Sequence, residues 1–214
     1  MFKKVFLALI IPLLVLLVGC YQAPKPILPG PVLYYPIPPN FTTYTQEGVF
    51  EISYPNDWRA TPQEIEEWNT QDAQSFLGQT GEVGIQPKGQ RLWLSAGRPT
   101  SGDYAWENLL SVLSYSKPTF WTVKDIVDGR RLWSEKVLQS HREMSRLNTI
   151  ISGQDGIIVE ESYHLPTYGQ VWYLTLYIIY GDTVWEVNCL TDAETQSLYE
   201  GTFRSVLKSF RILR

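Results

Sequence analysis

Few side chains in this sequence could act as a nucleophile and its general base. His141 and His164 are the only histidines, and a Ser-His-Asp or Cys-His arrangement requires one of them. His164 follows Glu160 and Glu161 near the end of an expected strand, but the chain has no Gly-x-Ser-x-Gly turn that would expose a nucleophile. We therefore predict that both histidines are surface or structural residues, and a hydrolase built on His164 is the enzymatic alternative.

A thiol nucleophile or a metal site would need cysteine, histidine or carboxylate side chains that converge. Cys189 alternates with Trp185 and Val187, which predicts a buried, inert thiol. The sequence has no zinc-type spacing, calcium loop or glycine-rich phosphate loop. The acidic residues after Thr61 are explained as capping and solvated residues that the helix dipole favours: Glu64, Glu66 and Glu67. We expect no metal and no cofactor.

Aromatic residues make up 14% of the chain, which contains eight tryptophans. Most of them should lie in a core, because Trp and Tyr side chains supply large buried areas. Three aromatic residues at the edges of expected loops could instead form an exposed platform for a glycan or a protein segment: Trp121, Tyr168 and Trp172. These three are the candidate binding residues.

The surroundings of Cys20 point to a defined chemical modification. Lys3 and Lys4 form a short basic segment, an uncharged apolar stretch runs from Val5 to Leu17, and Leu17-Val18-Gly19-Cys20 follows. This order resembles the signal peptide and lipobox of bacterial lipoproteins. The resemblance implies that cleavage between Gly19 and Cys20 removes residues 1–19, and that Cys20 carries a diacyl lipid, which suffices for stable anchoring.

The alternative to a cleaved lipoprotein signal is an uncleaved membrane anchor. The apolar run of about 15 residues is short for a span that needs roughly 20, and Pro12 weakens it as a helix. We therefore expect the mature chain outside the cytoplasm. Its lipid would hold it to the cell membrane, or to an outer membrane where one exists.

The charge of the chain limits its partners. The net charge is −4, and loss of Lys3 and Lys4 with the signal leaves 16 basic against 22 acidic side chains, a net charge of −6. Nucleic-acid binding needs clustered Lys and Arg to neutralise phosphates, and the sequence has no basic run. We therefore exclude nucleic acid as a partner and expect membrane contact through the lipid on Cys20.

Residues 20–40 are predicted to form a lipidated tether. Seven of the 14 prolines lie between Tyr21 and Asn40, and proline at this density favours polyproline II, a semi-rigid spacer of about 3.1 Å per residue. The alternative is a segment docked on the domain, which its apolar side chains would allow: Ile27, Leu28, Val32, Leu33, Tyr34 and Tyr35. Residues 41–214 are expected to form a single domain.

Hydrophobic periodicity and turn residues predict the elements of this domain. In its first half we expect a hairpin of 41–44 with 48–54, a helix from Thr61, a strand at 91–96, a helix from Asp103 through Leu113, and a helix within 120–143. The helix at Thr61 is favoured by a capping threonine followed by Pro62. For 120–143, a hairpin around Asp128-Gly129 is the alternative.

The second half predicts two more hairpins. One joins 147–152 to 156–164 at Asp155-Gly156, and the other joins 171–180 to 183–191 at Gly181-Asp182. The strand at 171–180 has bulky residues on both faces, as expected for a central strand. Glu186 and Asn188 predict that the following strand has a more solvent-exposed face.

A helix should close the domain after a capping box from Thr191 to Glu194. It would pack a stripe of four residues on the sheet: Tyr199, Phe203, Val206 and Phe210. Hairpins with helices between and after them predict an α+β domain with an antiparallel sheet. Helices covering both faces of that sheet would make a three-layer α/β/α sandwich.

Two stretches resemble one family. Phe50-Glu-Ile-Ser-Tyr-Pro55 followed by Trp58 resembles the F-x-I-x-Y-P-x-x-W pattern of PsbP-like domains, and Trp185–Thr191 with the closing helix is similar to their last strand and helix. The family, whose fold is an antiparallel sheet between helices, includes extrinsic photosystem proteins and bacterial lipoproteins. The resemblance implies a non-enzymatic binding or assembly module with an envelope protein or glycan partner. The alternatives are the His164 hydrolase and a structural stability factor of a membrane complex.

Overall fold

The computed structural model of the protein describes residues 36–62, 65–66, 69, 90–99, 106–166 and 168–213. The strands of this part are β1 (Phe41–Gln46), β2 (Phe50–Pro55), β3 (Arg59–Ala60), β4 (Arg91–Pro99), β5 (Trp106–Ser116), β6 (Gln139–Ile151), β7 (Gln154–Leu165), β8 (Gly169–Tyr180), β9 (Thr183–Asp192) and β10 (Arg211–Ile212). The helices are α4 (Val123–Val137), α5 (Gln196–Ser209) and a 3-10 turn η1 (Ala193–Thr195).

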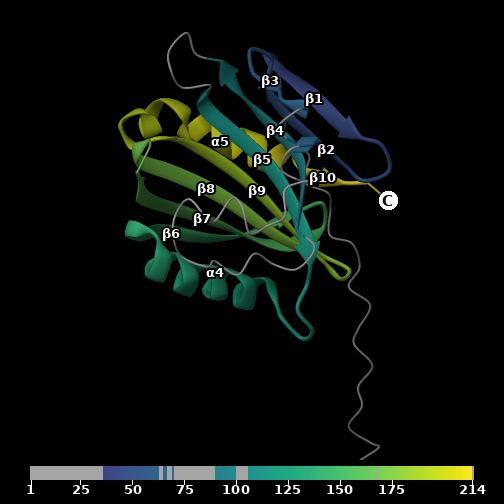
Figure 1. Cartoon of the computed structure of the whole chain (residues 1–214). Helices are drawn as coiled ribbons and strands as arrows, with labels where there is room; N and C mark the ends of the chain where they lie inside the picture. The colour runs from purple at the N-terminus through teal and green to yellow at the C-terminus, as the bar shows by residue number, and fades with distance from the viewer. Residues whose placement is uncertain are drawn as a thin grey trace, which may run out of the picture. The chain divides into compact units, whose positions relative to one another are not determined.

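The main feature of the fold is a seven-stranded sheet in the order β3-β4-β5-β9-β8-β7-β6 (Figure 1). Its neighbouring strands all pair antiparallel. A second, three-stranded sheet has the order β1-β2-β10. The hairpin β8–β9 lies in the middle of the large sheet, with a turn in which Gly181 has φ of 58°, a conformation that glycine adopts without strain.

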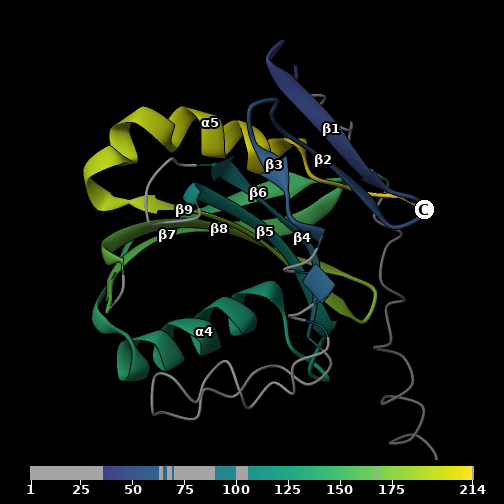
Figure 2. The ribbon, with the colours of Figure 1, turned by 45° about the horizontal axis from the view of Figure 1, so that its top comes forward.

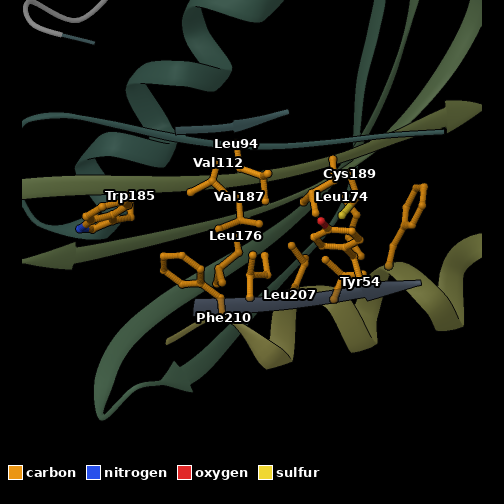
Figure 3. Packing of buried hydrophobic residues seen from close by; sticks show 14 of the residues in the cluster. Tyr54, Leu94, Val112, Leu174, Leu176, Trp185, Val187, Cys189, Leu207 and Phe210 are labelled. Atoms are coloured by element: carbon orange, nitrogen blue, oxygen red, sulfur yellow. The ribbon is translucent and has the colours of Figure 1, made fainter. Parts of the chain in front are cut away.

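One face of the large sheet carries the larger hydrophobic core. Leu174 and Leu176 of β8 point toward Leu207 and Phe210 at the end of α5 and beyond it (Figure 3). Trp172 and Phe203, both fully buried on this face, stack with their ring centroids 5.5 Å apart. The small sheet joins the same layer, because the Ser53 backbone N–H donates to the Ser209 hydroxyl at 2.8 Å.

The other face carries α4 and a smaller core (Figure 2). The helix begins at a capping box that the sequence reasoning missed: the Thr122 hydroxyl accepts from the Asp125 backbone N–H, and the Asp125 carboxylate accepts from the Thr122 backbone N–H. Ile126 and Val127 are its buried apolar residues. The contacts of α4 are with β6, β7 and β8.

The prediction of an α+β fold with an antiparallel sheet is confirmed. The predicted three-layer α/β/α sandwich, with helices covering both faces of the sheet, is not observed. On one face the covering layer is α5 together with the three-stranded sheet, and on the other face α4 packs mainly on β6, β7 and β8. The fold is therefore richer in sheet than predicted.

Several predicted elements are confirmed. The hairpins at 41–54 and 171–191 form as expected, the strand at 91–96 is part of β4, and the helix expected within 120–143 is α4, which ends at Val137 before β6 begins. The hairpin alternative at Asp128-Gly129 is wrong. Residues 62, 65, 66 and 69 are helical after Thr61, while the positions of Glu64, Glu67, Trp68 and Phe76 lie outside the described residues.

Three predictions about elements are wrong. The helix from Asp103 through Leu113 is contradicted, because β5 occupies Trp106–Ser116. The hairpin of β6 and β7 turns at Ser152-Gly153, both with positive φ, and not at Asp155-Gly156. The Thr191–Glu194 capping box does not form, because Thr191 and Asp192 remain in β9 and α5 starts after η1.

The stripe of α5 generates a stability prediction. Phe203→Ala should lower the free energy of unfolding by about 3–5 kcal/mol, because Phe203 is fully buried and stacks on Trp172. Leu198→Ala on the same helix is the matched control, since Leu198 is 74% exposed, and it should change stability by less than about 0.5 kcal/mol. Urea unfolding followed by circular dichroism measures both; similar losses in the two variants would contradict this packing.

Candidate functional site

The three aromatic residues predicted to form a platform do not come together. Trp172 is fully buried, with its ring on Phe203 and its indole N–H donating to Glu160 at 3.1 Å. This contradicts an exposed binding role for Trp172. The prediction failed because strand β8 continues to Gly169, so Trp172 lies within a covered strand and not at a loop edge.

Trp121 and Tyr168 are exposed, as predicted, at 43% and 52%. They lie at opposite ends of the large sheet. Tyr168 precedes the start of β8, whereas Trp121 follows Lys117, whose backbone N–H donates to Asp182 beyond the end of β8. A strand of 12 residues extends roughly 35–40 Å at about 3.3 Å per residue. The two residues therefore cannot contact the same small ligand. Their role in binding remains a prediction.

The histidines differ in their surroundings. His164 is half-buried in β7, and no side-chain hydrogen bond joins its imidazole to a nucleophile or a carboxylate among the described residues. The side chain of His141 is 2% exposed, and its Nε2 lies 3.1 Å from Oε1 of Glu161. Cys189 is buried in the larger core, as predicted, and burial raises the pKa of its thiol well above the usual value.

The part of the chain that the structure describes has no cluster of His, Cys, Asp and Glu side chains that could hold a metal ion. Within the same residues, no helix has both the length and the apolar character needed to cross a bilayer.

A cavity of about 80 Å³ lies between α4 and strands β7, β8 and β9. A single water needs about 10–15 Å³ of such space, so this cavity has room for several waters or a small ligand. Its lining comes from α4 and the residue after it on one side and from the sheet on the other: Arg130, Trp133, Ser134, Leu138, Glu161, Tyr163, Tyr173, Thr175, Tyr177 and Asn188. We take this cavity as the candidate site.

An ion pair forms one end of the site. Arg130 Nη2 lies 3.1 Å from Oε2 of Glu186, which is fully buried, and the Tyr115 hydroxyl donates to the other oxygen of Glu186 at 2.6 Å. Burial lowers the pKa of Arg130, but Glu186, Tyr177 and Tyr115 together outweigh that effect and the net shift is upward. Burial, and then Glu186, raises the pKa of Tyr115 and of Tyr177 well above the usual value. The two hydroxyls therefore stay protonated.

A row of hydrogen bonds crosses the floor of the cavity. The Thr175 hydroxyl donates to Oδ1 of Asn188 at 2.9 Å, and Nδ2 of Asn188 donates to the Ser111 hydroxyl at 3.4 Å. Beyond this row, Tyr163 and Tyr173 stack with ring centroids 4.8 Å apart. Burial raises the pKa of both tyrosines. The floor is thus polar, ordered and neutral between its charged ends.

One group in the lining of the cavity is not satisfied by the described residues. The indole Nε1 of Trp133 is buried and has no hydrogen-bond partner there, which is costly unless water or a ligand supplies an acceptor. Glu161, also in the lining, places one carboxylate oxygen 3.1 Å from Nε2 of His141.

Sequence reasoning missed this site. Glu186 was expected on a more solvent-exposed face, but it is fully buried because α4 and the Tyr115 side chain cover that face of β9. The sequence did contain a signal. Tyr173, Thr175 and Tyr177 alternate with Leu174 and Leu176 along a central strand, which indicates one apolar face and one aromatic-polar face.

The fold is similar to that of solved proteins. Cyanobacterial PsbP (CyanoP) of Synechocystis sp. PCC 6803 matches with a TM-score of 0.53 and 14% identity, over 81% of this chain and 92% of CyanoP. LpqN of Mycobacterium tuberculosis, involved in cell envelope biogenesis, matches with a TM-score of 0.51 and 9% identity, over 81% of this chain and 92% of LpqN. No family model matches the chain, and no curated protein matches its sequence. The fold implied by the PsbP-like resemblance is confirmed.

The ion pair of the site generates a second stability prediction. Glu186→Gln should lower the free energy of unfolding by about 2–3 kcal/mol, because it removes the fully buried counter-charge of Arg130, whose side chain is 30% exposed. Glu135→Gln on α4 is the control, since the pair of Glu135 with Arg131 is solvent-exposed, and it should cost less than about 1 kcal/mol. Thermal and urea unfolding measure the two losses. Equal losses would mean that the Arg130–Glu186 pair is not buried.

Proposed function

We propose that this chain is a cell-envelope lipoprotein whose PsbP-like domain is a non-enzymatic binding module. The observation that carries the proposal is the sequence Leu17-Val18-Gly19-Cys20 directly after a basic and then apolar segment. A lipid on Cys20 would hold the domain on the outer side of the cell membrane, or on an outer membrane. The proline-rich residues 20–40 would act as the spacer.

The fold supports a binding role. The fold is similar to the folds of CyanoP and LpqN, and LpqN is involved in cell envelope biogenesis. The described residues align no nucleophile with His164, whereas they enclose a polar cavity beneath α4. The domain would therefore bind a ligand or a partner without converting it.

The lipid anchor is tested by Cys20→Ser in the full-length protein. Serine cannot form the thioether that carries the lipid, so the variant should keep its signal sequence and lose labelling by a radioactive or clickable fatty acid. Gel mobility and fatty-acid labelling of membrane fractions measure the outcome. A variant that is still cleaved and still labelled would overturn the proposed anchor.

Counting reactive thiols in the wild-type protein provides an independent control. Native protein should not react with a thiol reagent, because Cys189 is buried and its pKa is raised by burial. In denaturant we expect a single reactive thiol, Cys189, since Cys20 would be blocked by its thioether. Two reactive thiols in denaturant would show that Cys20 is unmodified.

A further inference from the structure

Four of the ten side chains that line the cavity beneath α4 are aromatic: Trp133, Tyr163, Tyr173 and Tyr177. They come from the helix and from two strands. The faces of such rings carry partial negative charge. Aromatic side chains around one small volume can therefore attract alkylammonium groups.

The charges at the cavity also favour a positive occupant. The single cation in its lining, Arg130, already lies against Glu186 at 3.1 Å. Its guanidinium also lies over the Trp133 ring, 5.6 Å from the centroid, so Arg130 occupies one face of that ring. Glu161 is a separate carboxylate. It pairs in register with Tyr173, whereas Glu186 pairs with Tyr177, four residues further along β8.

That register separates the two acidic groups by roughly 13 Å, at about 3.3 Å per residue. Arg130 is therefore not the partner of Glu161. One oxygen of Glu161 lies 3.1 Å from Nε2 of His141, and the Glu161 side chain keeps 12% exposure. Nearby, Arg146 is shared between Glu143 and Asp128. The charged groups around this end of the cavity thus leave Glu161 without a fixed cation.

The unpartnered indole N–H of Trp133 adds a second requirement. It is buried and needs an acceptor. An occupant that satisfies both Glu161 and Trp133 carries a positive charge and an oxygen atom. A free anion would meet the carboxylates of Glu161 and Glu186, and a purely apolar molecule would leave the Trp133 N–H unsatisfied.

We propose that the cavity beneath α4 is a binding site for a small alkylammonium compound that also bears an oxygen acceptor. The aromatic rings enclose the cation, Glu161 supplies the opposite charge, and Trp133 donates to the oxygen. This rests on the proposed role of the domain as a binding module and names the class of its ligand. It does not depend on the lipid at Cys20.

The test uses choline as the probe and the full-length protein purified in detergent. Isothermal titration and the indole N–H resonance of Trp133 report binding, with 3,3-dimethyl-1-butanol as the neutral molecule of the same shape and acetate as an anion. We expect choline to bind at least about tenfold more tightly than the neutral molecule, since cation–π attraction and the carboxylate act on the charge alone. The Trp133 resonance should shift on binding.

Glu161→Gln should weaken choline binding by about tenfold or more. Glu160→Gln is the matched control. Glu160 is the neighbouring residue of β7 but faces the other side of the sheet, where it accepts from Trp172 and Gln196. The Glu160→Gln variant should therefore have unchanged choline affinity. The unfolding temperatures of both variants verify that they are folded.

Three outcomes would overturn the inference: no choline binding, equal affinity for choline and the neutral molecule, or equal losses in the two glutamate variants. Tighter binding of acetate would also overturn it and would assign the site to Arg130. None of these results bears on the lipid, which is tested separately at Cys20. Conversely, loss of the lipid assignment would leave a positive choline titration standing.

Discussion

Burial of both faces of β8 is the constraint on which the rest of the structure depends. Leu174, Leu176 and Ile178 enter the core beneath α5, while Tyr173, Thr175 and Tyr177 face α4. A slip of one residue in the β8–β9 register would exchange these two sets. It would place tyrosine hydroxyls in an apolar core and leucines against Arg130. The tight turn at Gly181 therefore fixes the positions of both layers.

The fold could be predicted from sequence wherever one short-range signal dominated. The hairpins at 41–54 and 171–191 have turn residues and β-rich flanks, and the stripe of α5 has helical spacing. Strand β5 was not predicted correctly. Leu110 and Val112 face one core while Leu113 and Tyr115 face the other side, so a strand covered on both faces produced the apolar spacing of a helix.

The site could not be predicted in the same way, because its groups come from four separate elements. Arg130 and Glu186 are 56 residues apart, and only the packing of α4 on the sheet makes them neighbours. Glu186 and Asn188 look solvent-exposed in sequence because the pattern of a strand does not reveal what covers its polar face. The prediction of an exposed Trp172 was wrong for the opposite reason, since this residue lies near a predicted loop but is buried in the core.

The two faces of the sheet differ in chemistry, and stability alone does not explain the difference. The α5 face is apolar and closely packed around Phe203 and Leu207. The α4 face holds an ion pair, a row of hydrogen bonds and an unpartnered indole N–H around a cavity. Apolar side chains of similar volume would stabilise that layer as well as or better than a buried ion pair. The ligand proposed for the cavity would use these polar and aromatic groups, whereas burial of apolar area alone gives no reason for them.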